Sequence, residues 1–552
     1  MVDILLVQPP IHDFYLTAKR TIPYGLASIA ASLTASGFSV DILDGLATSK
    51  SRTLPYPPEM SYLVPFYGAP DISPFGLFHP YRHYGYSFEH MARMAGLSGA
   101  RIVGISSLFT PYADEALLTA NSIRAALPHC RIVLGGHHPT ALPAAVMADP
   151  SVDFVLRGEG EVAMPALARA LTSGGELSRV PGIVYRKEDG TLHISEPAVM
   201  VSLDSHPLPD RNRINNRFYQ RGKKGTTVVV TSRGCPMKCS YCALGNRKLT
   251  PFRTRSVDAV LTEIGEAVLA HGARFIDFED ENLSFNRSWF LSLLHGISER
   301  FGDKKPELRA MNGLFPPTLD DAVAGAMKTA GFNALNLSLG SACPDQLKRF
   351  HRPDVRKAFV DALALAEKHG MEAVGYIIVG APGQYANDSI EDLLFLAGHR
   401  VLAGVSVYYP APASADYETC RQLGLLPQSF SLMRSSALPI SHTTTRLETV
   451  TLMRLGRIIN FMKHLVDRKI AIPRPERFDI ASRIDSGDRE TAGIHLLSGF
   501  LRDGLIRGLT PEGAVYEHAA SGSLIERFLT RLRTVPVKGV KGVGIPIPIV
   551  RP

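Results

Sequence analysis

Three cysteines stand within eight residues, in the sequence GCPMKCSYC at positions 234–242. Their spacing is C-x3-C-x2-C. A thiolate is a soft ligand that suits iron, and three thiolates on one short loop can hold three irons of a cubane 4Fe–4S cluster. The fourth iron then has no protein ligand and stays open to a small molecule. Cys235, Cys239 and Cys242 are therefore the predicted metal-binding and catalytic residues.

The surroundings of this loop favour a cluster over zinc. A zinc site would need a fourth Cys or His nearby, and none follows before His271. The apolar run at residues 226–231 predicts a buried strand that ends just before the loop. The other cysteines, Cys130, Cys343 and Cys420, are scattered along the chain, and we interpret them as buried small hydrophobic residues.

The cysteine spacing, with Tyr241 just before the third cysteine, resembles the signature of the radical S-adenosylmethionine (SAM) enzymes. The resemblance implies that the open iron chelates the amino and carboxylate groups of SAM. It also implies that an electron from the cluster splits SAM to give a 5′-deoxyadenosyl radical, so an external electron donor of the flavodoxin or ferredoxin type is expected. Strands and helices alternate along residues 225–440, where the family has a partial (β/α)6 barrel.

Several predicted strand ends of this barrel resemble the SAM contacts of the family. In barrels of parallel strands, chemistry gathers at the carboxyl ends. The family often has Gly-x-Glu-Ser after the fourth strand, but Gly340 stands here at the glutamate position. The alternative for Arg352 and for the turn of Gly380 and Pro382 is a purely structural turn, and for the acidic pair it is a helix N-cap. The predicted cofactor-binding residues are Tyr241, Asp280, Glu281, Asn312, Ser341, Arg352, Gly380 and Pro382.

Strands and helices also alternate near the N-terminus, which predicts an α/β fold with a doubly wound, Rossmann-like parallel sheet. Such sheets bind ligands at the carboxyl ends of their strands, and paired glycines there let the backbone approach a ligand closely. Residues 1–175 resemble the cobalamin-binding domain that precedes the radical SAM core in a large subfamily. The resemblance implies cofactor contacts from Gly135, Gly136, His137, Pro139, Thr140, Gly158, Glu159 and Gly160.

One element of another cobalamin-binding group is absent. That group has D-x-H-x-x-G after the first strand and uses its histidine as a cobalt ligand, whereas His12 lacks this spacing. We therefore expect cobalamin without a histidine lower ligand, its nucleotide tail buried in the sheet. His137 and His138 are interpreted as loop structure or corrin contacts.

Two further segments belong to this domain plan. Residues 46–97 form an insertion rich in aromatic residues and proline, too apolar for a disordered linker. Long loops in compact domains tend to be functional, so we interpret it as a cover over the cobalamin or substrate cavity. The alternative is an interface for a second subunit. Residues 176–224 are a predicted connector between the two domains.

Residues 441–552 are expected to form a mostly helical C-terminal region. The pattern at residues 447–465 predicts a long helix. Its basic residues Arg454, Arg457 and Lys463 are interpreted as a solvated face, with an anionic lipid surface as the alternative.

The composition fits a soluble protein of several domains, with 552 residues, 45% hydrophobic and 20% charged. A net charge of +8 is modest, and no nucleic-acid motif accompanies the basic residues, so nucleic acid is a disfavoured partner. The N-terminus lacks the basic segment of a signal peptide, and no uncharged run approaches the roughly 20 residues of a membrane span. An oxygen-sensitive cluster and few cysteines indicate a reducing cytoplasm.

The whole resemblance implies a cobalamin-dependent radical SAM enzyme. The leading hypothesis is a methyltransferase that methylates an unactivated carbon of a small molecule, lipid or peptide, by a 5′-deoxyadenosyl radical and methylcobalamin. An alternative keeps the cofactors but performs cyclisation or oxidation without methyl transfer. A second alternative is a non-catalytic cobalamin sensor or chaperone.

Overall fold

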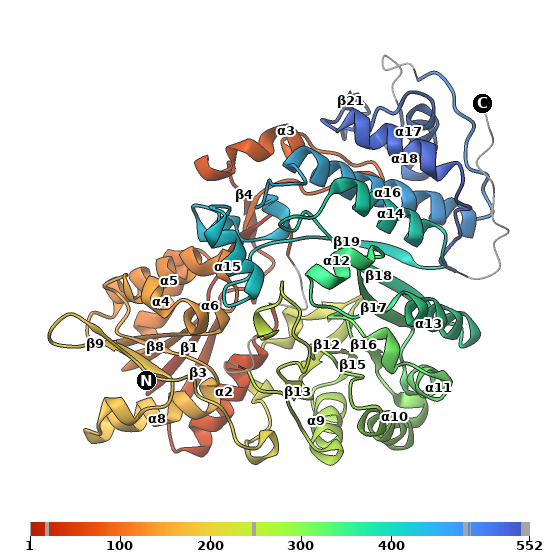
Figure 1. The fold of residues 1–552 in the computed structure, drawn as a ribbon. Coiled ribbons are helices and arrows are strands. Elements are labelled where there is room, and N and C mark those ends of the chain that lie inside the picture. Colours follow the sequence, from red (N-terminus) through yellow and green to blue (C-terminus); the bar gives the residue numbers. More distant parts are fainter. Residues whose placement is uncertain (1, 17–20, 246–249, 479–483, 486, 542–552) are drawn as a thin grey trace.

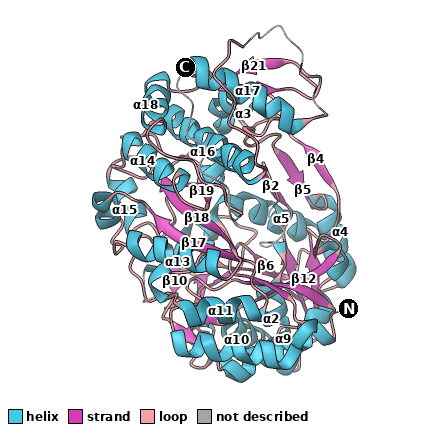
Figure 2. Ribbon diagram, turned by 90° about the vertical axis from the view of Figure 1, so that its right-hand side faces the viewer, coloured by secondary structure: helices cyan, strands magenta, loops and turns pink. Residues whose placement is uncertain are grey.

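A computed structural model describes residues 2–16, 21–245, 250–478, 484–485 and 487–541. Two α/β units lie side by side, and the C-terminal helices lie above the second unit in the view of Figure 1. The strands gather in the interior and most helices lie around them (Figure 2).

The N-terminal unit is a seven-stranded sheet of order β10-β9-β8-β7-β6-β1-β3. The five strands from β8 to β3 are parallel, and β9 and β10 add an antiparallel hairpin. The chain order reverses between β1 and β6, so their carboxyl ends form the switch point where doubly wound sheets bind ligands. The strands are β1 (Ile4–Gln8), β3 (Val40–Asp44), β6 (Ile102–Ser106), β7 (Arg131–Gly135), β8 (Phe154–Leu156), β9 (Ile183–Arg186) and β10 (Leu192–Ile194).

Helices cover both faces of this sheet, as a doubly wound fold requires. One apolar cluster joins it to α4 and α5, and a second joins it to α2 and α8. The prediction of a Rossmann-like N-terminal domain is confirmed. The helices are α2 (Tyr24–Ala35), α4 (Phe88–Ser98), α5 (Ala113–Ala126), α6 (His137–Ala141), α7 (Pro143–Met147) and α8 (Gly160–Ser173).

The second unit contains six parallel strands in two groups, β12-β15-β16 and β17-β18-β19. Parallel bridges from Leu308 to Phe332 and from Leu314 to Leu337 join the groups, so the predicted partial (β/α)6 barrel is confirmed. The strands are β12 (Lys224–Val229), β15 (Ala273–Phe278), β16 (Glu307–Arg309), β17 (Ala334–Gly340), β18 (Glu372–Val379) and β19 (Leu402–Val407), with β11 (Gln220–Arg221) antiparallel at one edge. The helices are α9 (Val257–Leu269), α10 (Arg287–Phe301), α11 (Asp321–Ala330), α12 (Pro344–Arg349), α13 (Arg356–Lys368), α14 (Ala386–Ala397) and α15 (Ala415–Gln422).

The C-terminal region is mostly helical, as expected, and it includes one antiparallel hairpin. Its longest helix begins at a capping box, in which Thr445 and Glu448 satisfy each other's backbone N–H groups. One apolar cluster joins this region to the barrel. The elements are α16 (Arg446–Asp467), α17 (Arg489–Asp503), β20 (Arg507–Leu509), β21 (Val515–Glu517) and α18 (Gly522–Leu532).

The insertion is shorter than the sequence analysis expected. Residues 88–98 form α4, which packs against α5 as an ordinary crossover helix. Residues 46–87, here called the strap, therefore depart from the Rossmann alternation. The strap contains β4 (Ser51–Thr53), α3 (Val64–Tyr67) and β5 (Arg82–Tyr84), and β5 also pairs with β2 (Ile11–Asp13).

The strap ties the N-terminal unit to the C-terminal helices. Tyr67 and Phe75 are buried in the same apolar cluster as α16, and α3 lies beside α16 in Figure 1. Asp71 accepts a hydrogen bond from the backbone N–H of Leu509 (3.1 Å) and pairs with His518 (2.8 Å). The apolar residues of the strap therefore pack within this chain, and its role as a cavity cover stays a prediction.

The expected solvated basic face of α16 is wrong for two of its three residues. Arg454 is 2% exposed and donates to the carbonyls of Phe66 and Phe75, at 2.9 and 3.1 Å. Lys463 is fully buried, and its ammonium donates to three backbone carbonyls. Arg457 alone is exposed. Helical periodicity predicts which face of α16 carries the basic residues. It does not show that backbone carbonyls of distant segments will accept hydrogen bonds from Arg454 and Lys463.

Across the described ranges, no helix combines the length and the apolar character needed to cross a membrane. The cytoplasmic location inferred from the sequence stays a prediction.

Candidate active site

The cysteine loop is closed at its base by a two-stranded antiparallel ribbon, β13 (Ser232–Arg233) and β14 (Arg253–Thr254). The three cysteines are free, with Cys239 buried and the other two half-buried. Burial raises the pKa of the Cys242 thiol to about 11, and the charges of Cys239 and Cys235 add to this effect. The three thiols are thus close enough for the charge of one to raise the pKa of another. Such a group suits a cationic iron–sulfur cluster, because the cluster stabilises thiolates.

The arrangement differs from a site for a single metal ion. In the part of the chain that the structure describes, no three His, Cys, Asp or Glu side chains converge as one ion would require. A 4Fe–4S cluster has no such requirement, because each cysteine binds a different iron. The donor set therefore fits the cluster, with Cys235, Cys239 and Cys242 as its ligands.

Arg352 lies against the cysteine loop. Its Nη1 donates to the Tyr241 hydroxyl (3.2 Å) and lies 3.8 Å from Sγ of Cys239. Its Nη2 donates to the backbone carbonyl and hydroxyl of Ser338 on β17, at 2.6 and 2.8 Å. The Tyr241 ring packs edge-on against Phe350. The structure thus brings Tyr241 and Arg352 together beside the cluster ligands.

The missing family glutamate at Gly340 has a steric explanation. Gly340 has a φ of +81°, and a Cβ there would lie 3.1 Å from Cδ of Arg352. A side chain at this position would therefore be strained and would displace Arg352. Nε of Arg352 is buried and has no hydrogen-bond partner among the described residues. This orphaned donor beside the cysteines fits a bound ligand, such as SAM.

The acidic pair after β15 divides into two roles. Asp280 is buried and accepts hydrogen bonds from the hydroxyls of Thr231 (2.7 Å) and Ser232 (2.5 Å), which fixes the segment that leads into the cysteine loop. Burial, followed by the charge of Asp280, raises the pKa of Glu281 to about 8. The charge of Glu281 in turn acts on Cys235 and Cys242. Glu281 therefore remains the carboxyl group available to the amino group of SAM.

Ser341 is held by a residue that the sequence analysis did not single out. Its side chain is fully buried and its hydroxyl donates to Asp392 of α14, at 2.9 Å. Asp392 also accepts from the backbone N–H of Ala342 (2.6 Å). The hydroxyl of Ser341 thus shapes the turn after β17, and only its backbone is left for SAM.

The other predicted SAM contacts lie at neighbouring strand ends. Asn312 follows β16 and donates to the backbone carbonyl of Glu279 (2.9 Å). Gly380, with φ +76°, follows β18 and begins the turn that contains Pro382. The carbonyl of Gln384 in this turn accepts a hydrogen bond from Thr444 (2.7 Å), so the turn is tied to the segment that leads into α16.

At the switch point of the N-terminal sheet, a glycine pair lies against the end of β6. The Ser107 N–H donates to the carbonyl of Gly135 (2.8 Å). Gly136 has φ +125°, and a Cβ there would lie 2.5 Å from the Ser107 carbonyl oxygen. The Ser107 hydroxyl is buried and has no partner among the described residues. The close approach of Gly136 is a packing contact with Ser107, whereas the orphaned Ser107 hydroxyl fits a cofactor held at these strand ends, and Leu108, exposed by 40%, offers an apolar contact.

The two histidines after β7 differ. His137 is open to solvent, yet enough protein surrounds it that desolvation, then the charge of Arg233, lowers the pKa of its imidazole. His138 is buried, its ring packs edge-on against Phe430, and burial lowers its pKa to about 4. His137 therefore lies within the electrostatic reach of Arg233, which precedes the cysteine loop, and His138 is part of the loop structure.

Protein contacts account for the other predicted N-terminal site residues. Thr140 donates to the carbonyl of Gly136 (2.7 Å) and accepts from the N–H of Gly158 (3.0 Å), and Pro139 is buried beside it. A Cβ on Gly158 would lie 2.2 Å from the carbonyl oxygen of Ala198. Gly160 packs similarly against the side chain of Ile29.

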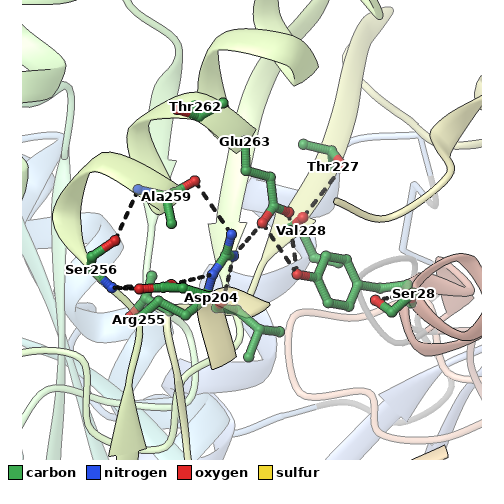
Figure 3. A network of polar contacts seen from close by, with 12 residues as sticks. Ser28, Asp204, Thr227, Val228, Arg255, Ser256, Ala259, Thr262 and Glu263 are labelled. Carbon is green, nitrogen blue, oxygen red and sulfur yellow. Dashed lines mark hydrogen bonds and ion pairs between the residues drawn. The ribbon is translucent and has the colours of Figure 1, made fainter. Parts of the chain in front are cut away.

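A buried polar network joins the two units behind these loops. Glu263 of α9 is fully buried and pairs with Arg211 (2.5 Å) and with Arg255. The Tyr24 hydroxyl of α2 donates to Glu263 (3.2 Å), so this network crosses from the barrel to the N-terminal sheet. Figure 3 shows Glu263 pointing from its helix toward Arg255.

Arg233 makes the same crossing two residues before Cys235. It pairs with Glu161 and, at 3.4 Å, with Glu159, both at the start of α8. Arg233 follows β12 and the two glutamates follow β8, so these contacts bring the carboxyl ends of strands from both sheets together.

Comparison with known families identifies both the N-terminal unit and the barrel. The profile described as the Radical SAM superfamily matches residues 229–396, and that described as the B12 binding domain matches residues 80–168. The chain is a radical SAM enzyme with a B12-binding domain. Its cofactors are a 4Fe–4S cluster and SAM in the radical SAM domain and cobalamin in the B12-binding domain.

Curated relatives of this radical SAM enzyme match over most of their length. An uncharacterised methyltransferase, PH0819 of Pyrococcus horikoshii, is 27% identical, covering 70% of this chain and 75% of the relative. The cytidylyl-2-hydroxyethylphosphonate methyltransferase of Streptomyces wedmorensis is 24% identical, covering 78% and 84%. The anaerobic magnesium-protoporphyrin IX monomethyl ester cyclase of Cereibacter sphaeroides is 26% identical, covering 56% and 51%.

Solved structures share the fold of this radical SAM enzyme. TsrM from Kitasatospora setae, a radical SAM methyltransferase with cobalamin and a 4Fe–4S cluster bound, has a TM-score of 0.59 at 17% identity, covering 77% of this chain and 79% of that one. The cobalamin-dependent radical SAM enzyme OxsB with aqua-cobalamin bound has a TM-score of 0.60 at 16% identity, covering 85% and 69%.

Several residues of this site escaped the sequence analysis. Arg233 and Arg253 flank the cysteine loop, but an arginine beside a motif carries no signal of its partner in a distant segment. Asp392 lies on a helix, where a carboxylate normally faces solvent. Ser107 directly follows a predicted strand, and that position was the available signal for it.

Proposed function

We propose that this enzyme transfers a methyl group to an unactivated carbon of its substrate. The observation that carries the proposal is the pairing of Arg233 with Glu161, because it brings the base of the cluster loop onto the B12-binding domain. Two relatives matched over most of their length also carry methyltransferase names. A small molecule, a lipid and a peptide all remain candidate substrates.

Each cofactor has a candidate set of holders. Cys235, Cys239 and Cys242 hold the cluster, while Arg352 and Glu281 contact SAM. Ser107, His137 and the glycine pair after β7 contact cobalamin. When bound, the cluster and SAM supply a 5′-deoxyadenosyl radical that removes a hydrogen atom from the substrate, and cobalamin supplies the methyl group.

The residues of the chain contribute position and charge. Asp280 fixes the entry to the cysteine loop, and Arg352 places a cation beside it. The contact between the two domains keeps the reacting groups close together, and such orientation lowers a barrier without new chemistry. An external electron donor of the flavodoxin or ferredoxin type remains part of the proposal.

A second candidate is a cyclase or oxidoreductase that uses the same cofactors without methyl transfer. The similarity to the magnesium-protoporphyrin ester cyclases favours it, although they match over a smaller part of the chain.

SAM carrying a labelled methyl group separates the two candidates without a known substrate. The protein is reconstituted anaerobically with iron, sulfide and cobalamin, reduced, and given labelled SAM alone. Methyl transfer predicts label retained on the cobalamin-loaded protein, with release of S-adenosylhomocysteine. Formation of 5′-deoxyadenosine without S-adenosylhomocysteine would instead support the cyclase candidate.

The cluster dependence is tested in parallel with Cys235→Ala. This variant is expected to lose nearly all of the about four irons per chain and all formation of 5′-deoxyadenosine, while retaining cobalt. Cys343→Ala is the matched control, because Cys343 is also a half-buried free thiol. Iron retention by Cys235→Ala would contradict the assigned ligand set.

A further inference from the structure

Four charged side chains connect the base of the cluster loop to the B12-binding domain. Arg233 and Arg253 come from the ribbon β13–β14, whereas Glu159 and Glu161 come from the start of α8. Arg253 binds Glu159 with two hydrogen bonds, Nη2 to Oε1 at 2.7 Å and Nη1 to Oε2 at 3.0 Å. Arg233 pairs with Glu161 and reaches Oε1 of Glu159 at 3.4 Å.

We call Arg233, Arg253, Glu159 and Glu161 the clamp. These four side chains are shielded from solvent. The side chains of the two glutamates are 12% and 7% exposed, and those of Arg253 and Arg233 are 17% and 26% exposed. Bidentate arginine–carboxylate contacts of this kind are strong and fix orientation as well as distance. Removing one partner leaves the other charge uncompensated in a poorly hydrated place.

The two arginines weaken this ribbon when they are not paired with carboxylates. Arg233 and Arg253 are directly opposite each other in the antiparallel pair. Like charges at opposed positions of a strand pair destabilise it, and this ribbon has only two residues on each strand. Carboxylates from the other domain therefore supply the charge that lets the base of the cluster loop close.

The connector between the domains takes part in the same contact. Both the backbone N–H and the carbonyl of Met200 are used, the N–H by Glu159 and the carbonyl by Arg253 (2.7 Å). Glu159 also donates its own N–H to the carbonyl of Ala198 (2.9 Å). The clamp is thus built from three parts of the chain that are distant in sequence.

We propose that Arg233, Arg253, Glu159 and Glu161 are positioning residues that set the separation and orientation of the cluster relative to the cobalamin. Glu159, which the sequence associated with cofactor binding, acts in this clamp through its carboxylate. The inference needs only the two cofactors and does not depend on methyl transfer, so its failure is distinct from failure of the proposed function.

The magnetic interaction between the reduced cluster and cob(II)alamin tests the proposal. Both centres are paramagnetic, and their dipolar interaction falls with the cube of their separation, so the splitting and relaxation of their EPR signals report the geometry. In the protein that contains both the cluster and cobalamin, we expect the double variant Glu159→Gln/Glu161→Gln to weaken this magnetic interaction or to broaden its distribution. Iron and cobalt should remain bound. An interaction identical to that of the unaltered protein would overturn the proposal.

Asp153→Asn is the matched control. Asp153 also pairs with two arginines, Arg124 at 2.5 Å and Arg131 at 3.2 Å, within the N-terminal domain and away from the cluster loop. This variant should keep the interaction unchanged.

A charge exchange covers the case in which the Gln variant does not fold. Glu159→Arg and Arg253→Glu are each expected to lose the interaction, because each places like charges together. Their combination restores opposite charges and should recover both folding and the magnetic interaction. The proposal would be overturned if the exchanged pair showed no more folding and no stronger magnetic interaction than the single variants.

Discussion

Asp392 shows how a single buried carboxylate shapes the turn after β17, where a SAM contact is predicted. It is fully buried, and its oxygens accept from Ser341 and from the N–H of Ala342. Burial is the main reason that its pKa rises from 3.8 to about 7. The residue therefore couples the turn after β17 to protonation.

This shift gives stability a definite pH dependence. The folded pKa lies above the unfolded value, so the contribution of Asp392 is fully present below about pH 4 and is lost as the pH rises through about 7. When the pH rises from 5 to 8, we expect the free energy of unfolding to fall less for Asp392→Asn than for the unaltered protein. Urea unfolding midpoints of the apo proteins at the two pH values measure this, and equal losses in both would refute the assignment.

At the scale of elements, α16 is held by a cation inside the protein. Arg454 donates to carbonyls of the strap and lies 3.6 Å from Asp71, which is itself buried. Truncation to Arg454→Ala leaves these acceptors unsatisfied, so we expect a loss of about 3–5 kcal/mol in the free energy of unfolding.

Arg457 on the same helix provides the comparison, because it is exposed. Arg457→Ala should change stability by only about 0.5 kcal/mol. Urea unfolding of the two variants side by side distinguishes them. Similar costs would mean that the buried contacts of Arg454 do not anchor the strap to α16.

At the scale of the whole molecule, the barrel, the strap and the C-terminal region share one apolar cluster. The N-terminal sheet has separate clusters on its two faces. The barrel therefore depends on the helices that follow it, whereas the N-terminal sheet buries its own faces.

Deletion of residues 441–552 tests this dependence. Residues of α16, including Leu455 and Ile459, are fully buried against the barrel cluster, so their loss exposes a large apolar surface. We expect the shortened chain to be insoluble or to lose its iron. Gel filtration and iron analysis after anaerobic expression measure the outcome, and a soluble monomer with about four irons would show that the barrel stands alone.

The sequence alone predicted the two α/β units, the three cysteines proposed as cluster ligands and the strand ends proposed for the cofactors. These features depend on local spacing and on hydrophobic periodicity, both of which can be read along the chain. The sequence also showed that the strap is rich in apolar residues. It further showed that Gly340 stands where the family often has a glutamate.

Only the tertiary structure decided which charges meet. Arg233 and Glu161 are 72 positions apart, and Arg454 contacts carbonyls more than 370 positions away. Pairing of this kind depends on how whole elements pack, since a side chain carries no mark of its distant partner. For the same reason the solvated face expected for α16 was wrong, and Glu159, assigned by resemblance to a cofactor, has its carboxylate in contact with the ribbon below the cluster.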